Sequence, residues 1–247
     1  MKLTVLGCWA PYPTPNQACS GYLLEHNDKR LLIDLGHGSF GKLQQVSDFS
    51  RLDAVFISHL HPDHCADLSC LRHAVLGEMR KGNQRPRLPV YMPSAPAANF
   101  DILANFEDAF EVHIVDTDSC LGLAIAGMEC QVFKTAHPIP TFGLVAEGNK
   151  KFVYTSDTSW EDKLVDLCRH AGILLCEASL AEADAHLATK GHLTAAQAGL
   201  LAARSEVSQL VITHFWPGYV PEDLGKEVSN VWKGKCALAR EFGEYTC

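Results

Sequence analysis

Several absences in the sequence narrow what the protein can be. Its ten cysteines form no C-x-x-C pair, which argues against a zinc ribbon or a redox-active dithiol. No apolar run approaches the roughly 18–20 residues that a membrane-spanning helix needs, and the apolar start before the first prolines is too short for a signal peptide. We therefore expect a cytoplasmic protein with reduced cysteines and no membrane partner.

Positive charge is also scarce. The formal net charge is −8 at pH 7, so there is no general electrostatic attraction to nucleic acid or acidic membranes, and we expect no strong nucleic-acid binding. A local group of basic residues exists, which we interpret as a solvated face and loop. These residues are Arg72, Arg80, Lys81, Arg85 and Arg87.

What the chain does contain is a regular alternation of strand-like and helix-like patterns over 247 residues, enough for one large α/β domain. The predicted strands are 2–6, 21–25, 30–34, 52–57, 90–92, 111–115, 121–126, 129–135, 142–146, 152–155, 173–176 and 209–213. The predicted helices are 40–49, 63–79, 95–109, 161–170, 194–205 and 221–241. Two similar halves without a linker predict a single domain, 1–247, with two sheets face to face and helices outside.

The most informative stretch is the turn Ser58-His59-Leu60-His61-Pro62-Asp63-His64, which follows the predicted buried strand 52–57. His59 and His61 are two residues apart, so in extended backbone their side chains point to the same side. Pro62 ends the extension, and Asp63 and His64 begin a helical pattern. Three imidazoles and one carboxylate in a single turn predict a metal site.

Three further polar residues, His137, Asp157 and His214, each follow a predicted strand. Loops at strand ends build the sites of α/β proteins. One metal ion cannot use all of these donors, whereas two ions can.

The donors therefore predict a dinuclear centre. We expect one ion to be bound by three histidines, the other by a carboxylate and two histidines, and a second carboxylate to bridge them: His59, His61 and His137; Asp63, His64 and His214; and Asp157. Imidazole and carboxylate ligands without thiolate favour Zn²⁺, with Mn²⁺ or Fe as substitutes. Two such ions hold a shared hydroxide that can act as the nucleophile.

The order His59-x-His61-x-Asp63-His64, then His137, Asp157 and His214, with Asp34 upstream, resembles the metallo-β-lactamase superfamily. The resemblance implies an αββα sandwich with the dinuclear site at one edge. It also implies that Asp34 supports a ligand histidine, the alternative being a turn residue at a strand end. The reaction class stays open, because the superfamily includes lactamases, thioesterases, lactonases and phosphodiesterases.

Three segments are similar to the ribonuclease Z branch of that superfamily: 137–143 (HPIPTFG), 154–158 (YTSDT) and 191–199 (GHLTAAQAG). In the last of these, the resemblance implies that His192, assisted by Asp63, gives a proton to the leaving group. Glu177 is expected either to orient His192 or to serve as a solvent-facing or capping residue.

One departure from that branch bears on the substrate. Members that process transfer RNA carry a long arm between the positions of His137 and Asp157, whereas only the 19 residues 138–156 lie between them here. The chain is therefore more similar to the arm-less phosphodiesterases. We expect a dinuclear-metal-dependent hydrolase of small phosphodiesters, cyclic ones included, that acts through a metal-bridging hydroxide.

Other functions stay open. The first alternative is a carboxylic ester, lactone or thioester hydrolase; a transfer-RNA 3′-processing endoribonuclease and a non-catalytic metal-binding protein are the others. The resemblance implies a homodimer. We interpret the remaining histidines as structural or surface residues, although two could reach the cleft, namely His37 and His186. Asn16 and Ser20 are open candidates for substrate contact.

Overall fold

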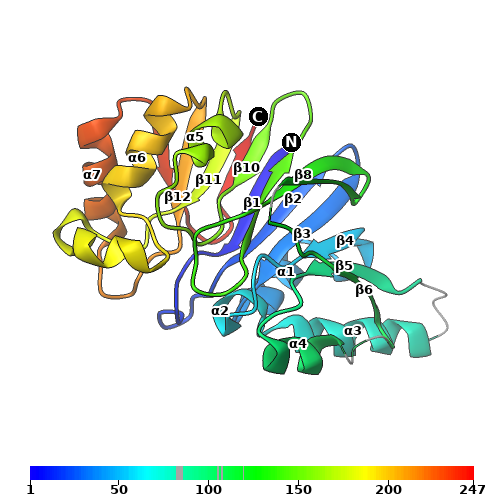
Figure 1. Cartoon of the computed structure of the whole chain (residues 1–247). Coiled ribbons are helices and arrows are strands. Elements are labelled where there is room, and N and C mark those ends of the chain that lie inside the picture. The colour runs from blue at the N-terminus through cyan, green and yellow to red at the C-terminus, as the bar shows by residue number, and fades with distance from the viewer. Residues whose placement is uncertain (82–85, 105, 107, 119) are drawn as a thin grey trace.

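The computed structural model describes residues 1–81, 86–104, 106, 108–118 and 120–247. In this part of the chain, two seven-stranded sheets lie face to face and helices cover the outer side of each (Figure 1). This layering confirms the predicted α/β sandwich of two mixed sheets with helices outside. That 1–247 is a single domain stays a prediction.

The first sheet combines the N-terminal strands with the C-terminal one. Its order is β14-β1-β2-β3-β4-β5-β6, antiparallel from β14 to β3 and parallel from β3 to β6. The strands span Lys2–Gly7 (β1), Gly21–His26 (β2), Lys29–Leu35 (β3), Ala54–Phe56 (β4), Leu88–Met92 (β5), Phe110–Ile114 (β6) and Glu244–Thr246 (β14).

The second sheet repeats this mixture with strands from the rest of the chain. Its order is β13-β12-β11-β10-β9-β8-β7, parallel from β13 to β10 and antiparallel from β10 to β7. The strands span Cys120–Ile125 (β7), Met128–Lys134 (β8), Phe142–Ala146 (β9), Phe152–Tyr154 (β10), Ile173–Glu177 (β11), Gln209–Thr213 (β12) and Lys235–Leu238 (β13).

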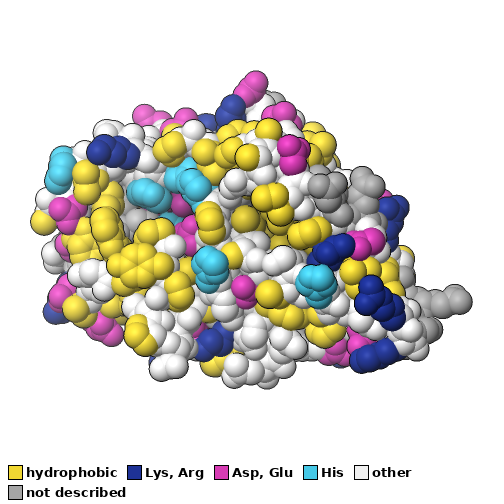
Figure 2. Space-filling model, turned by 90° about the horizontal axis from the view of Figure 1, so that it is seen from below, with side chains coloured by type: hydrophobic (Ala, Val, Ile, Leu, Met, Phe, Trp, Pro, Cys, Tyr) yellow, Lys and Arg dark blue, Asp and Glu magenta, His cyan; other side chains and the backbone are white. Residues whose placement is uncertain are grey.

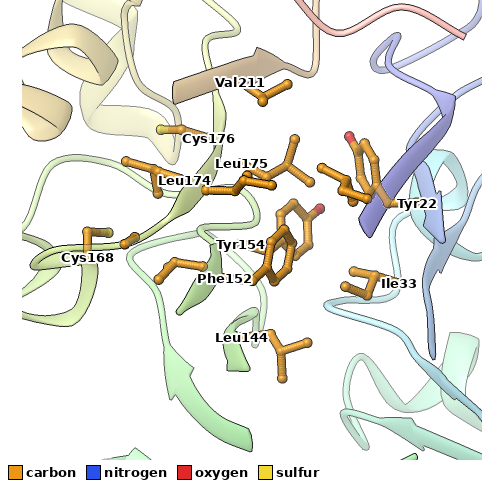
Figure 3. Close-up of a cluster of buried hydrophobic side chains, with 14 of the residues drawn as sticks. Tyr22, Ile33, Leu144, Phe152, Tyr154, Cys168, Leu174, Leu175, Cys176 and Val211 are labelled. Atoms are coloured by element: carbon orange, nitrogen blue, oxygen red, sulfur yellow. The ribbon is translucent and has the colours of Figure 1, made fainter. Parts of the chain in front are cut away.

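The core between the sheets follows from the two-residue period of the strands. Along β3, Leu31 and Ile33 belong to the cluster between the sheets, whereas Leu32 belongs to the cluster under the helices of the first sheet. Aromatic side chains fill the space between the sheets, where the rings of Tyr22 and Tyr154 lie 5.4 Å apart (Figure 3). Both faces of the first sheet are therefore buried, which explains its nearly continuous apolar strands.

Helices α1 to α4 cover the first sheet and α5 to α7 the second (Figure 1). They span Ser39–Val46 (α1), Pro62–Cys65 (α2), Leu68–Arg80 (α3), Ala97–Ala104 (α4), Lys163–Cys168 (α5), Ala195–Arg204 (α6) and Pro221–Val231 (α7), with short 3₁₀ helices at Phe49–Arg51 and Glu182–Lys190. The sequence did not predict the second 3₁₀ helix.

The predicted helix 63–79 is interrupted. The helical hydrogen bonding is interrupted at Asp67, whose N–H donates to the carbonyl of Leu35 at 3.0 Å and whose carboxylate accepts from the N–H of Phe40 at 3.1 Å. These bonds tie the chain to the end of β3, and α3 begins afresh at Leu68. The predicted helix 95–109 is shorter as well, and its residues 105 and 107 lie outside the described part.

The prediction of a closing helix over 221–241 is wrong beyond Val231. The chain turns there and forms β13 beside β12, then β14 beside β1. Cys247 N–H donates to the carbonyl of Met1 at 3.1 Å, so the two termini lie together (Figure 1). Pairing with distant strands, which a local pattern does not contain, determines these segments.

Of the basic residues, Arg72 is bonded to the carboxylate of Asp108 at 2.9 and 2.5 Å, as expected for a solvated face. Arg85 and the loop residues 82–84 lie outside the described residues.

Candidate metal centre and active site

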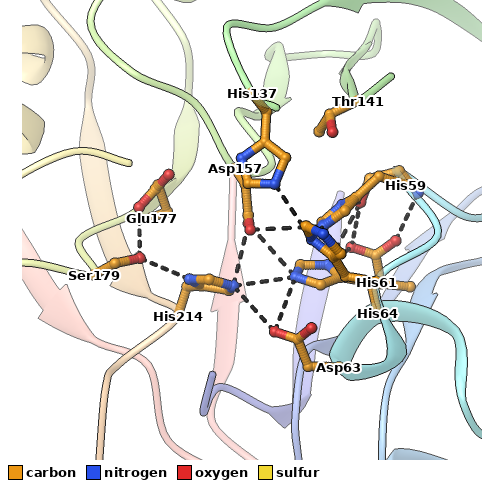
Figure 4. Close-up of polar contacts among 12 residues, drawn as sticks. His59, His61, Asp63, His64, His137, Thr141, Asp157, Glu177, Ser179 and His214 are labelled. Atoms are coloured by element: carbon orange, nitrogen blue, oxygen red, sulfur yellow. Dashed lines mark hydrogen bonds and ion pairs between the residues drawn. The ribbon is translucent and has the colours of Figure 1, made fainter. Parts of the chain in front are cut away.

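The predicted metal ligands meet at one edge of the sandwich, although they come from both sheets (Figure 4). The turn with the first four donors follows β4, and the other three residues follow β8, β10 and β12, at the strand ends where we expected them. The converging side chains are those of His59, His61, Asp63, His64, His137, Asp157 and His214.

The backbone turns sharply where strands deliver these side chains. Asp34, Ser156 and His214 have φ angles of 55°, 54° and 63°, in the left-handed region that residues other than glycine seldom adopt. Such conformations cost on the order of 1–3 kcal/mol each and persist where the surroundings impose them. Their position at three strand ends of one edge marks this edge as a built site.

The donors fall into two groups. Nitrogen and oxygen atoms of His59, His61, His137 and Asp157 lie within 4.8 Å of one another, as do those of Asp63, His64 and His214. Asp157 lies between the groups: Oδ2 is 3.6 Å from Nε2 of His59, and Oδ1 is 3.2 Å from Nε2 of His214. The two groups contain the same residues as the two sets expected from the sequence.

Hydrogen bonds to the outer nitrogens fix the tautomers of four histidines. Nδ1 of His64 donates to Oδ2 of Asp34 at 2.8 Å. The hydroxyl of Ser58 donates to that same carboxylate oxygen at 2.9 Å, so its oxygen can accept from Nδ1 of His59 at 3.1 Å. In a neutral imidazole only one nitrogen carries hydrogen, so Nε2 of His59 and His64 presents a lone pair.

The other two histidines follow the same rule. Nδ1 of His137 donates to the carbonyl of Gly191 at 3.0 Å. Ser179 donates its hydroxyl hydrogen to Glu177 at 2.6 Å, and its oxygen therefore accepts from Nδ1 of His214 at 2.7 Å. Nε2 of both rings is then a bare acceptor as well.

These nitrogens lie close to one another and to Nδ1 of His61. Nε2 of His64 and His214 are 3.1 Å apart, and Nδ1 of His61 lies 3.0 Å from Nε2 of His59 and 3.3 Å from Nε2 of His137. Two lone pairs at this distance repel unless a proton or a metal cation lies between them. Two nitrogens bound tetrahedrally to one Zn²⁺ at about 2.0–2.1 Å are roughly 3.3 Å apart, so the residues fit divalent ions.

The buried carboxylates of the site are also consistent with binding of divalent ions. Oδ1 of Asp157 is buried and accepts no hydrogen bond from the described residues, a costly state for an anion without a cation. Burial opposes its ionisation, but the histidines, His214 and His64 first, hold the pKa of Asp157 well below its usual range. Burial would lower the pKa of His64, yet the carboxylates of Asp157, Asp63 and Asp34 raise it to about 10, so that without an ion Nε2 of His64 carries a proton where a metal ion would otherwise bind. The site thus attracts positive charge.

Asp34 has the supporting role that the resemblance implied. Its buried carboxylate accepts from the N–H and hydroxyl of Ser58, from His64 and, at 2.6 Å, from the hydroxyl of Tyr154. Tyr154 belongs to the core between the sheets, so these bonds join the core to the histidine-rich turn.

Glu177 is buried and orients two histidines at once. Oε1 lies 3.3 Å from Nδ1 of His192, and Oε2 holds His214 through Ser179. Burial lowers the pKa of His192, but the charge of Glu177 outweighs it and raises this pKa to about 9. Of the two readings of Glu177, the structure therefore favours the orienting one.

A cavity of about 450 Å³ opens beside the two groups. Figure 2 shows histidine side chains in a hollow bordered by hydrophobic ones. The cavity is also lined by residues that the sequence analysis did not predict, because nothing in their type or spacing set them apart. They are Ala10, Pro11, Ser179, Leu180, Leu187, Lys190 and Trp216. Asn16, Ser20, His37 and His186 are not among the lining residues. Position alone could have indicated two of the missed residues, since Ser179 follows Glu177 by two positions and Trp216 follows His214 by two.

Comparison with known proteins shows which family the chain is part of. The family described as the beta-lactamase superfamily domain matches residues 29–215, most of the chain. The chain belongs to this superfamily. Within it, the probable metallo-hydrolase YhfI of Bacillus subtilis is 30% identical over 243 residues, 97% of each chain. Ribonuclease Z of Chlamydia trachomatis is 29% identical over 98% of this chain and 96% of its own.

Solved structures of the superfamily agree on the fold. The crystal structure of the metallo-beta-lactamase fold protein YhfI superposes with a TM-score of 0.91 at 29% identity, covering 99% of this chain and 98% of that one. Human tRNase Z, short form, superposes with a TM-score of 0.78 at 23% identity, over 100% and 99% of the two chains. The chain is thus a metallo-hydrolase of the beta-lactamase superfamily with a site suited to divalent metal ions.

None of the helices in the described part of the chain has both the length and the apolar composition needed to cross a bilayer.

Proposed function

We propose that the protein is a cytoplasmic dinuclear-metal phosphodiesterase that hydrolyses small phosphodiesters, cyclic ones among them. His59, His61 and His137 would hold one ion, Asp63, His64 and His214 the other, and Asp157 both. Zn²⁺ suits these donors best, with Mn²⁺ or Fe as substitutes. When bound, such ions supply a water of lowered pKa and neutralise charge on the phosphate.

The observation that carries the proposal is the position of His192. It lies beside both donor groups, with its ring 5.3 Å from that of His137 and 5.6 Å from that of His214. Atoms of His192, Asp157 and His214 lie within 4.8 Å of one another. A site that only binds metal has no use for a further histidine held by its own carboxylate.

The chain's own residues then divide the work. Glu177 keeps His192 protonated near pH 7, so that His192 can donate a proton to the departing alkoxide, with Asp63 assisting. An alkoxide leaving phosphorus needs that proton, whereas a stable phenolate does not. The proposal is also supported by the similarity to ribonuclease Z, whose name denotes cleavage of a phosphodiester chain.

The test is turnover by His192→Ala. We expect metal content to stay the same and turnover of a cyclic phosphodiester with an alkoxide leaving group to fall about 10²–10⁴-fold. Turnover of bis-p-nitrophenyl phosphate, whose leaving group needs no acid, should change little. Full activity of the variant on the alkoxide substrate would contradict the role of His192.

The second candidate is a carboxylic ester, lactone or thioester hydrolase, which could use the same metal centre. Lys190 favours the phosphodiester, because a cation in the cavity suits an anionic substrate better than a neutral ester. Comparing bis-p-nitrophenyl phosphate with p-nitrophenyl acetate and a homoserine lactone separates the two. Cleavage of the neutral esters alone would overturn our proposal. Processing of transfer RNA fits less well, because the short segment 138–156 leaves no room for a long arm.

A further inference from the structure

Trp216 exposes an indole ring in the cavity beside the metal groups. The residue is 42% exposed, although Phe215 before it is buried and packs edge-on against Trp9 at 6.0 Å. His214 and Trp216 both line the cavity, while Phe215 anchors the segment in the core. A large aromatic surface left open beside a reactive centre marks a place where a ligand binds.

The ring is held in place without being covered. The N–H of Tyr219 donates to the carbonyl of Trp216 at 2.9 Å, and the two rings meet edge-on at 6.1 Å. The hydroxyl of Tyr219 donates in turn to the carboxylate of Asp184, in the 3₁₀ helix Glu182–Lys190. An indole fixed in this way offers a flat face with little entropy left to lose on binding.

Other residues that line the cavity with Trp216 are either apolar or positively charged. Leu180 and Leu187 add further apolar surface to the cavity, and Lys190 adds a positive charge. Within the described part of the chain, no carboxylate lies within ion-pair distance of Lys190. The lining thus combines a flat apolar surface, a cation and the metal groups.

We propose that Trp216, with Leu180 and Leu187, forms a subsite for a flat uncharged ring attached to the phosphodiester, such as a nucleobase, and that Lys190 attracts the phosphodiester anion. The proposal rests on the phosphodiesterase function proposed above and specifies its substrate class. A volume of about 450 Å³ lies in the range of cavities that enclose small ligands. Bases stack on aromatic rings whatever their sequence, because each has a π-face.

The experiment uses two substrates with the same sugar and phosphate: a nucleoside cyclic phosphate and the matching cyclic phosphate of the methyl riboside, which has no base. For Trp216→Ala we expect KM for the nucleotide to rise roughly 5- to 150-fold, with kcat and the riboside kinetics unchanged. Trp216→Phe, which keeps a flat ring, should restore most of the loss. Lys190→Glu should instead lower kcat/KM for both substrates to the same extent.

Two matched variants outside the cavity complete the design, Phe242→Ala for an exposed aromatic ring and Lys233→Glu for an exposed lysine, and both should behave as the wild type. Equal effects of Trp216→Ala on the two substrates, or no effect on either, would overturn the subsite while leaving the phosphodiesterase intact. A wild-type protein that hydrolyses neither substrate would overturn both proposals.

Discussion

Ser58 and Ser179 determine the tautomers of the histidines to which they are hydrogen-bonded. Each donates its hydroxyl hydrogen to a buried carboxylate, Asp34 or Glu177, and its oxygen is then left to accept from Nδ1 of a neighbouring histidine. The inward nitrogen is thereby left bare. A carboxylate, a hydroxyl and an imidazole in series thus prepare a lone pair for a cation before any ion arrives.

Asp157→Ala tests the most connected residue of the centre. The carboxylate lies between the two donor groups, so its loss removes a donor from each and leaves the surrounding nitrogens without their shared anion. We expect the purified variant to have lost bound metal, measured by elemental analysis, together with activity. A normal content of two ions per chain would refute the bridging role.

Glu177→Gln tests the link between charge and proton donation. The carboxylate raises the pKa of His192, so an uncharged amide should lower it, and His192 should lose its proton at a lower pH. We expect the alkaline limb of the kcat profile on a cyclic phosphodiester to move to lower pH. An unchanged limb would contradict the coupling, and Glu244→Gln, which alters an exposed carboxylate on β14, is the control.

At the residue scale, the sequence predicted the candidate metal ligands better than the other residues that line the cavity. Histidines and aspartates at strand ends have few other reasons to gather, so His137, Asp157 and His214 could be named from position and type. Trp216 and Lys190 could not, because an aromatic residue or a lysine in a loop has many uses, and only the folded cavity shows which one applies. Glu177 stayed ambiguous until its distance to His192 was known.

At the scale of elements, the segment after the 3₁₀ helix Glu182–Lys190 is built to present His192. Gly191 has a φ of 106°, and its carbonyl accepts from Nδ1 of His137. Thr194 then caps α6 and forms a reciprocal capping box with Gln197. One tight turn thereby positions a metal-site histidine and the proposed acid together.

Gly191→Ala should damage this turn. A Cβ at this position would lie 2.6 Å from Nδ1 of His137 and 2.6 Å from Cδ of Pro138, in a backbone conformation that alanine seldom adopts. We expect a lower melting temperature and weaker metal binding, measured by thermal unfolding and by competition with a chelator. Gly77→Ala in α3, where a Cβ meets nothing within 4 Å, should instead be neutral or stabilising. Equal behaviour of the two variants would contradict the close approach at Gly191.

Helices and strands could be predicted where a local pattern of apolar and polar residues determines them. Most strands and helices were expected within a few residues, because buried strands carry continuous apolar runs. The failures have physical causes: the break at Asp67 depends on a bond to Leu35, and β13 and β14 are short edge strands that exist through pairing with β12 and β1. Interactions between distant segments decided these cases.

At the scale of the whole molecule, two mixed sheets bring the ends of their strands to one edge. Tyr22 and Tyr154 extend from the shared core, and their hydroxyls bond to Thr213 and Asp34, beside the metal groups. The centre is therefore continuous with the core between the sheets. Occupancy of the site and stability of the fold should be coupled.

Metal removal is expected to destabilise the entire fold. Without ions, imidazole nitrogens that face one another at 3.0–3.3 Å, at an edge to which both sheets contribute, have no metal to hold them together. A ligand present at 100 times its Kd stabilises the native state by about 2.7 kcal/mol, so chelation should shift the urea midpoint downward by a corresponding amount and added Zn²⁺ should reverse it. Asp157→Ala, which is expected to bind little metal, should show almost no shift. Equal urea midpoints for the chelated and the metal-loaded wild type would mean that the native protein does not bind the ions. The proposed metal-dependent hydrolysis would then be refuted.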